Sequence, residues 1–250
     1  MSNVKIRDVR VILTEPEPGS RFTVVKIETT EPGLYGIGCA SLRTRPQAVK
    51  VAIEQYLRPF LIGKDPSDIE DIWQSAYVSS YWRSGPILNN ALSGVDEALW
   101  DIKGKEAGMP VHQLLGGPCR SAVPCYAHAG GNDLEALLDE IHRYMEEGYA
   151  VIRCQLGAYG GGGFIPAEQA LRPRNAWPQQ QAFDDEAYLE NIPKMFEFLR
   201  QKLGFGPKLT HDAHEHLRPQ SAVTLSKLLE PFRLYFLEDV LSPGEVGWYP

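Results

Sequence analysis

The first forty residues alternate between apolar and polar positions, which is the period of a β-strand. The alternation covers residues 4–16 and 22–29 and resumes at 34–41, after a Pro-Gly turn. Short alternating runs joined by tight turns are typical of an antiparallel meander. We therefore expect three antiparallel strands at the start of the chain.

The next part of the chain has apolar residues every three to four positions, which indicates helices. This spacing covers roughly 48–59 and 69–76, and the longest stripe runs over 86–107. Pro86 suits the first turn of that helix and Gly108 suits its C-terminal cap. Three strands followed by helices predict an α+β domain, which we assign to residues 1–118.

Residues 119–250 alternate between short apolar runs and helical patterns, an order that indicates parallel strands covered by helices. We expect strands at 122–128, 149–155, 208–214 and 234–239, and helices at 134–145, 186–203 and 218–232. Four strands make half of an eight-stranded barrel, which takes about 250 residues. The predicted fold is thus an α+β capping domain followed by the first half of a (β/α)₈ barrel. The alternative to a half-barrel is an open four-stranded parallel sheet. Because a closed barrel needs four more strands, we expect the sequence to be the front part of a longer protein.

A long connection at 157–184 interrupts this alternation and begins with four glycines, Gly160 to Gly163. Connections of this length are usually disordered or serve as lids over a site. The glycines lack the spacing of a phosphate-binding loop, so we do not assign them to nucleotide binding.

Composition narrows the class of protein. The chain has 250 residues, 43% of them hydrophobic, and a net charge of −7 without a block of Lys or Arg, which argues against a nucleic-acid surface. It has neither a run of about 20 apolar residues nor an N-terminal signal pattern, so we expect no membrane span and a cytoplasmic location. Its four cysteines lack a CxxC pair, and we expect buried thiols rather than disulfides or a zinc site.

Carboxylates stand at the ends of the last two predicted strands, at Asp212 and Glu238. The ends of successive parallel strands meet at one edge of a sheet, where α/β folds bind their ligands. Carboxylate oxygens favour Mg²⁺ or Mn²⁺, with a third acid or waters completing the shell. The alternative is that both acids only form salt bridges to neighbouring loops.

His214 lies two positions after Asp212, so on a strand the two side chains would point into one space. A zinc site from His211, His214 and His216 is less favoured, because residues three apart on a strand face opposite sides.

Further candidate residues lie on the first two barrel strands. Arg153 is near the end of the second strand, and Tyr159 begins the connection after it. An adjacent cation favours phenolate, so Tyr159 is a candidate base, although it could equally pack on the glycine loop. His128, at the tip of the first strand, could bind a substrate hydroxyl or cap a helix.

Several blocks of the sequence together resemble the enolase superfamily, and within it the mannonate dehydratase subgroup of the mandelate racemase-like sugar-acid dehydratases. They occur in the family's order and span nearly the whole chain. The blocks are Tyr81-Trp82-Arg83-Ser84-Gly85-Pro86, Ala98-Leu99-Trp100-Asp101-Ile102-Lys103-Gly104-Lys105, Gln113-Leu114-Leu115-Gly116-Gly117, Tyr126-Ala127-His128, Ile152-Arg153-Cys154-Gln155, His211-Asp212-Ala213-His214 and Leu237-Glu238-Asp239.

The resemblance implies a Mg²⁺ ion on acids from three successive barrel strands. Asp212 matches the first ligand and Glu238 the second, while the third, with a further catalytic His, is expected beyond residue 250. In this family the metal stabilises the enediolate that forms when a base removes the proton next to the substrate carboxylate. Tyr159 assisted by Arg153 matches that base, and His214 matches the acid that protonates the departing 3-hydroxyl. The product would be a 2-keto-3-deoxy sugar acid.

Two departures from the family pattern bear on the substrate. The dehydratase pattern has a substrate-contacting Asn where this chain has Arg43, and the loop between Arg153 and Tyr159 is shorter and lacks a Pro-Gly pair. Mannonate, gluconate or another hexonate is therefore the expected substrate class. A weakly active or non-catalytic relative that binds metal and sugar acid is the rival interpretation. The resemblance also implies a homo-oligomer.

Overall fold

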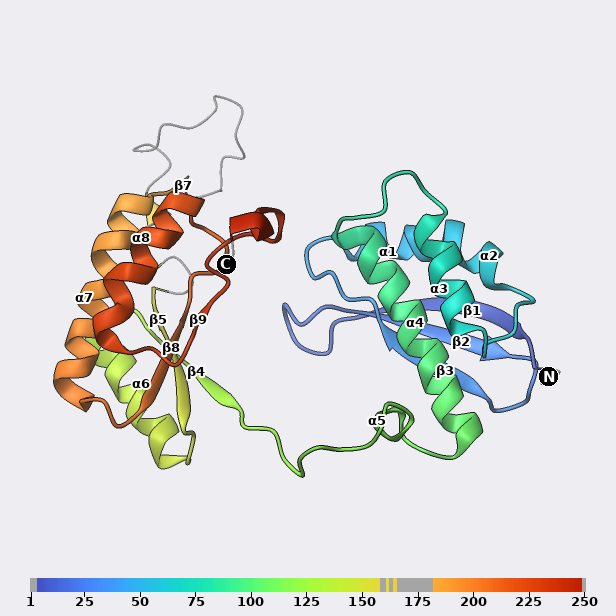
Figure 1. Ribbon diagram of the computed structural model, residues 1–250, viewed down its shortest axis with the longest axis horizontal. Coiled ribbons are helices and arrows are strands. Elements are labelled where there is room, and N and C mark those ends of the chain that lie inside the picture. Colours follow the sequence, from blue (N-terminus) through green and yellow to red (C-terminus); the bar gives the residue numbers. More distant parts are fainter. Residues whose placement is uncertain (1–3, 158–160, 162–163, 166–181, 249–250) are drawn as a thin grey trace. The chain divides into compact units, whose positions relative to one another are not determined.

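The computed structural model describes residues 4–157, 161, 164–165 and 182–248 (Figure 1). The chain forms two compact units, Met1–Ser121 and Ala122–Pro250, each with its own core of buried apolar side chains. The predicted base Tyr159 and most of the long connection lie outside the described residues.

Unit 1 contains the predicted antiparallel sheet, with the strand order β1-β2-β3. Its strands are β1 (Ile6–Thr14), β2 (Phe22–Thr29) and β3 (Tyr35–Cys39). The helices that follow are α1 (Pro46–Ala52), the π-helical turn η1 (Ile53–Leu57), α2 (Arg58–Leu61), α3 (Ile69–Val78), α4 (Pro86–Ala107) and α5 (Val111–Leu114). Gly108 ends α4 in the left-handed conformation, as predicted.

Helix α4 packs directly on strand β3 because two glycines open the space for it. A Cβ added at Gly36 or Gly38 would overlap with the backbone carbonyl of Ala98 or Gly94 on the helix. The close approach buries the apolar stripe of α4 against the sheet. The Trp100-Asp101-Ile102-Lys103 block that carries the family resemblance thus belongs to a helix–sheet contact.

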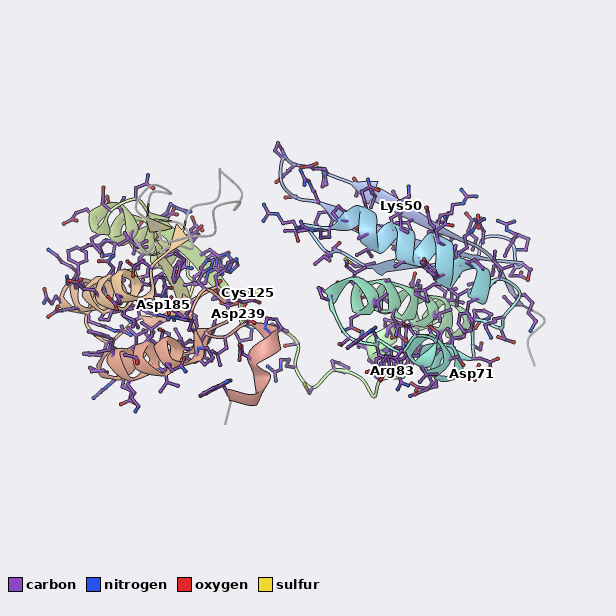
Figure 2. The ribbon with its side chains drawn as sticks, turned by 90° about the horizontal axis from the view of Figure 1, so that it is seen from above. Lys50, Asp71, Arg83, Cys125, Asp185 and Asp239 are labelled. Carbon is purple, nitrogen blue, oxygen red and sulfur yellow. The ribbon has the colours of Figure 1, made fainter. Side chains whose placement is uncertain are left out.

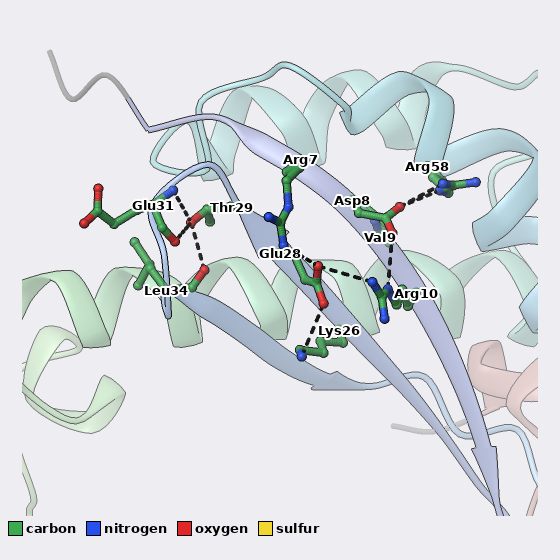
Figure 3. Close-up of polar contacts among 10 residues, drawn as sticks. All are labelled: Arg7, Asp8, Val9, Arg10, Lys26, Glu28, Thr29, Glu31, Leu34 and Arg58. Carbon is green, nitrogen blue, oxygen red and sulfur yellow. Dashed lines mark hydrogen bonds and ion pairs between the residues drawn. The ribbon is translucent and has the colours of Figure 1, made fainter.

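Charged side chains cover part of β1 and β2 (Figure 3). Glu28 pairs with Arg7 at 2.7 Å and with Lys26 at 3.3 Å, while Asp8 pairs with Arg58 at 2.9 Å. Arg10 bridges the two acids, at 3.2 Å from Asp8 and 3.5 Å from Glu28. This network joins two strands and α2.

Unit 2 contains the four predicted parallel strands, in the order β4-β5-β8-β9. They are β4 (Tyr126–Gly131), β5 (Val151–Leu156), β8 (Lys208–Asp212) and β9 (Leu237–Glu238). A separate antiparallel pair is formed by β6 (Phe164–Ile165) and β7 (Ala182–Phe183). Two short 3₁₀ turns flank β9 in the sequence: η4 (Glu230–Phe232) precedes it and η5 (Pro243–Trp248) follows it.

Three helices cover one face of the parallel sheet (Figure 1). They are α6 (Leu134–Glu146), α7 (Asp185–Leu203) and α8 (Pro219–Leu229). Alternate strand residues, among them Ala129, Ile152 and Leu209, enter the core between sheet and helices. The other face carries the polar positions of the strands. Parallel strands with a covering helix after each of β4, β5 and β8 are the arrangement of part of a (β/α)₈ barrel, as predicted.

Four expectations need correction. Strand β8 ends at Asp212 and not at His214, β4 starts at Tyr126 rather than Ala122, and β9 covers only Leu237–Glu238 of the strand expected at 234–239. Only Cys154 is a buried thiol, while Cys39, Cys119 and Cys125 are exposed, because they lie on the outer edge of β3 and in the segment before β4 rather than in a core. None of the helices in the described ranges is long and apolar enough to cross a membrane.

Candidate active site

The polar face of the parallel sheet brings together the two carboxylates at the strand ends. Asp212 on β8 pairs in register with Glu238 on β9, so both side chains leave the sheet at the same edge. Asp212 is only 2% exposed, whereas Glu238 is partly accessible. The juxtaposition predicted from the sequence is therefore present.

Arg153 on β5 lies between these acids. Its Nη1 atom is 2.9 Å from Asp212 Oδ2 and 3.9 Å from Glu238 Oε2. Both Arg153 and Asp212 are buried, and a buried carboxylate requires such a cationic partner to remain charged. One guanidinium thus compensates much of the negative charge at the sheet edge.

His128 on β4 extends this group of side chains. Its Nδ1 atom lies 2.9 Å from Arg153 Nη2, and since arginine can only donate, Nδ1 accepts and the proton of neutral His128 resides on Nε2. Burial, followed by the positive charge of Arg153, lowers the pKa of His128. His128 can therefore present an Nε2–H donor to a ligand oxygen at neutral pH.

His214 comes next to Asp212 by a turn rather than by strand alternation. Its backbone N–H donates to Asp212 Oδ1 at 2.7 Å, and its Nδ1 lies 3.2 Å from Asp212 Oδ2. His214 and Glu215 both have positive φ, of 53° and 63°, an unfavourable conformation for side chains with a Cβ. Two backbone hydrogen bonds hold the turn: the Ala213 N–H donates to the carbonyl of Glu238 in β9, and the Glu215 N–H donates to the carbonyl of Asp239, the next residue. The half-exposed imidazole is fixed beside the carboxylates.

Tyr126 is a site residue that the sequence interpretation did not single out. Its hydroxyl lies 2.9 Å and 3.0 Å from the two carboxylate oxygens of Glu238, and its ring stacks on His128. Burial and the hydrogen bond to Glu238 raise the pKa of Tyr126, so its hydroxyl stays protonated and donates. Tyr126 is two positions before His128 on one strand, and this spacing alone would have predicted a shared face.

Hydrogen bonds from β5 and from α7 also hold strand β8, which carries Asp212. Gln155 on β5 donates to the Asp212 backbone carbonyl at 2.8 Å. His211 faces the helices, where its Nε2 lies 2.8 Å from the Tyr188 hydroxyl on α7 and its Nδ1 lies 2.8 Å from the Cys154 carbonyl. Burial lowers the pKa of His211 to about 4, so it is neutral and structural. These bonds fix the position of β8 between its neighbours.

The other two predicted residues are not among the described residues of unit 2. Tyr159 lies outside the described residues. Arg43 is an exposed side chain of unit 1, where its guanidinium lies beside Gly19. Their predicted roles, as base and as substrate contact, stay predictions.

The donor set decides which metal fits. Asp212 and Glu238 offer hard carboxylate oxygens, which suit Mg²⁺ better than Zn²⁺. Among the described residues there is no group of three or more His, Cys, Asp or Glu side chains that could hold a metal, so further oxygen ligands would have to complete a shell. The buried orientation of His211 also removes it from a zinc site with His214 and His216.

Comparison with known proteins identifies relatives of both units. Residues 5–116 match the mandelate racemase/muconate lactonizing enzyme N-terminal domain. A D-galactonate dehydratase family member from Paenibacillus sp. (strain JDR-2) is 54% identical over 245 residues, which cover 98% of this chain and 60% of that protein. Another from Musicola paradisiaca (strain Ech703) is 54% identical over 260 residues, covering 99% of this chain and 62% of that protein. The chain thus spans about 60% of the length of these curated relatives.

Solved structures also match nearly the whole of this chain. An enolase from Pantoea ananatis with bound D-gluconate and magnesium is 52% identical, with a TM-score of 0.86 over 98% of this chain and 62% of that one. A 3,6-anhydro-D-galactonate cycloisomerase from Zobellia galactanivorans is 26% identical, with a TM-score of 0.74 over 98% of this chain and 61% of that one.

Proposed function

Because the chain belongs to the enolase superfamily, in the group of sugar-acid dehydratases related to mandelate racemase and muconate lactonizing enzyme, we propose that the protein is a Mg²⁺-dependent hydro-lyase. The reaction removes the proton next to the carboxylate of a sugar acid and expels the 3-hydroxyl as water. It yields a 2-keto-3-deoxy sugar acid. The observation that carries this proposal is the pairing of Asp212 with Glu238 beside Arg153.

Asp212 and Glu238 are the residues that would hold the ion. When bound, Mg²⁺ supplies positive charge that stabilises the negative charge developing on the substrate carboxylate. The hydrogen bonds from Tyr126 to Glu238 and from Gln155 to the Asp212 carbonyl keep both carboxylates at the sheet edge before any ligand arrives.

The remaining side chains handle the substrate and its protons. His214 lies half-exposed beside Asp212, and in the protonated form it donates a proton to the departing 3-hydroxyl. His128 donates from Nε2 to a substrate hydroxyl. We assign proton abstraction to Tyr159, with Arg153 favouring its phenolate.

The substrate class is a hexonate. A relative of 52% identity binds D-gluconate together with magnesium, so gluconate is the first candidate and mannonate the second. D-galactonate is the third candidate substrate, because curated relatives carry the name D-galactonate dehydratase family member. Arg43 is expected to contribute to the choice among them, because the hydroxyl groups that find partners decide specificity. We expect the protein to act in the cytoplasm, with a sugar acid as its small-molecule partner.

The first test is turnover by the full-length protein on gluconate, mannonate and galactonate with Mg²⁺, reading out the 2-keto-3-deoxy product. Asp212→Asn should reduce turnover by about 10³-fold or more, because it removes a charged ligand and leaves Arg153 unbalanced. Asp139→Asn, on the exposed side of α6, is the control and should retain wild-type turnover.

Binding of the metal gives an independent measurement. Isothermal titration with Mg²⁺ should show one site in the wild-type protein and none in Asp212→Asn. Wild-type metal binding without product from any of the three acids would refute the dehydratase proposal and favour a protein that only binds them. Equal Mg²⁺ binding by Asp212→Asn would refute the assignment of the metal site.

A further inference from the structure

The turn that carries His214 belongs to neither a helix nor a strand. Residues 213–218 connect the end of β8 to the start of α8. The His214 side chain is 46% exposed, so burial alone does not fix its position. A proton donor must lie within hydrogen-bond reach of the group that departs. The contacts that hold this turn therefore bear directly on the reaction proposed above.

The end of β7 and the first turn of α7 contact the chain on both sides of His214. Before it in the sequence, the hydroxyl of the buried Tyr188 lies 2.8 Å from His211 Nε2. After it, the ring of Phe183 packs on the ring of His216, with centroids 4.9 Å apart. The His216 ring in turn meets the His214 ring edge to face, with centroids 5.8 Å apart. The start of α7 thus contacts both segments that flank the proton donor.

Asp185, the first residue of α7, joins this helix to the end of the turn by polar contacts (Figure 2). Its Oδ2 atom accepts hydrogen bonds from Ser221 Oγ at 2.5 Å and from Arg218 Nε at 2.9 Å. Arg218 is the N-cap of α8 and Ser221 lies in its first turn, so both donors belong to the point where the turn ends. The Asp185 side chain is only 11% exposed. One carboxylate therefore connects the starts of α7 and α8, which lie side by side on the sheet (Figure 1).

The Asp185 carboxylate is ionised at neutral pH. Burial alone would raise its pKa, but the hydrogen bonds from Ser221 and Arg218 outweigh this effect and hold the pKa below its ordinary value of 3.8. The preceding residue, Asp184, already caps α7 by accepting from two backbone N–H groups of the first turn. Asp185 is therefore not required to cap its own helix, and its carboxylate is directed to α8.

From these contacts we propose that Asp185 is a positioning residue for His214, an inference that rests on the proposed role of His214 as proton donor. Asp185 acts through the start of α8, which fixes the point where the turn ends. The metal ligands depend less on this contact, because Asp212 ends a strand that pairs in register with Glu238. Loss of the Asp185 carboxylate should therefore slow proton transfer to the departing hydroxyl and leave metal binding in place.

Hydrogen exchange of the full-length protein without substrate tests the contact itself. In Asp185→Ala, peptides that span residues 213–218 should exchange about 10-fold faster, while peptides from β8, residues 208–212, keep the wild-type rate. Alanine favours a helix, so α7 should be retained. Glu190→Ala, which removes an exposed acid that pairs with Lys194 on the same helix, is the matched control and should exchange as the wild type does.

Steady-state turnover of the acid that the wild type converts tests the consequence. Asp185→Ala should lower kcat by about 10-fold or more, because small displacements of a catalytic group are costly. The KM and the Mg²⁺ dissociation constant should stay within about 2-fold, since the variant loses an interaction that matters in the transition state. Asp185→Asn keeps an oxygen that accepts both hydrogen bonds, and its kcat should stay within about 3-fold of wild type. Glu190→Ala should retain the wild-type kcat.

Three results would overturn the positioning role. The first is wild-type exchange at residues 213–218 together with a wild-type kcat in Asp185→Ala. The second is an equal rise of exchange at 213–218 and in β8, which would mean a general loss of stability. The third is a parallel loss of Mg²⁺ affinity, which would mean that the whole site has moved. Absence of product from the wild-type protein would instead refute the dehydratase reaction, and with it the role of His214, while the exchange rates would still show whether Asp185 holds the turn.

Discussion

Individual residues at the sheet edge work as a connected group rather than as separate ligands. Arg153 contacts Asp212, Glu238 and His128, so a change in any one of these side chains alters the charge felt by the others. Tyr126 is the member with the simplest role, because it has one polar atom and one acceptor group, the Glu238 carboxylate.

Tyr126→Phe removes only that hydroxyl. The ring still packs on Phe236 and His128, so the fold should not change. Glu238 would lose its orientation, and we expect Mg²⁺ affinity to fall by about 10-fold, the lower end of the range for residues that support metal ligands. Titration calorimetry measures this directly, and unchanged affinity in a folded variant would show that Tyr126 does not position Glu238.

Glu28 is a residue whose charge supports stability at a distance from the site. The hydrogen bond from Arg7 is the largest cause that holds the pKa of Glu28 below its ordinary value of 4.5. The carboxylate therefore contributes to stability above that value, and the contribution is lost as the pH falls through the lower pKa of the folded state.

Glu28→Gln should accordingly lower the urea midpoint at about pH 7 and make a smaller difference at about pH 3, because the contribution of the carboxylate is lost as the pH falls through its lowered pKa. Glu17→Gln, at an exposed position, serves as the control and should have little effect at either pH. A midpoint difference between Glu28→Gln and wild type that is equal at both pH values would contradict the pairing with Arg7, Arg10 and Lys26.

At the scale of elements, strand β3 depends on helix α4 for both packing and hydrogen bonds. Its free edge is covered by side chains one helical turn apart: Asp101 accepts from the Ile37 N–H and Glu97 from the Cys39 N–H, each at 2.8 Å, while Lys105 donates to the Tyr35 carbonyl. Four helical residues advance nearly as far as two strand residues, so the periods match. An edge covered in this way cannot pair with another chain.

Gly38→Ala tests this contact. The new methyl group would overlap with the Gly94 carbonyl and push α4 from the sheet, and we expect a loss on the order of 3 kcal/mol in the free energy of unfolding. Gly206→Ala, where no atom lies within 4 Å of the added methyl group, should be nearly neutral. Equal effects of the two substitutions in chemical denaturation would show that α4 can move away at little cost.

For the molecule as a whole, the two units have separate cores. Among the residues that the structure describes, those of the first core lie between Ile6 and Ile102, and those of the second lie between Ala129 and Leu241. A unit with a core of its own can in principle fold alone.

We therefore expect residues 1–121, expressed alone, to fold and to unfold in one cooperative transition. Dispersed amide signals in an NMR spectrum and a single sigmoidal urea transition would be the expected results. A molten fragment, with secondary structure but without sharp side-chain signals, would show that unit 1 requires unit 2.

The sequence by itself determined the order and type of the elements, because hydrophobic period, proline and glycine act locally. It predicted α4 to the residue, the four parallel strands, and the convergence of Asp212 and Glu238, which follows from parallel strands ending at one edge. Tertiary structure alone decided what depends on contacts between distant residues. Strand β8 ends at Asp212 because the Asp212 carboxylate accepts a hydrogen bond from the His214 N–H. Backbone hydrogen bonds to β9 and the residue after it stabilise the left-handed turn that follows. The tertiary structure also placed Arg153 between the carboxylates, turned His211 into the helix core and joined Tyr126 to Glu238, 112 positions later.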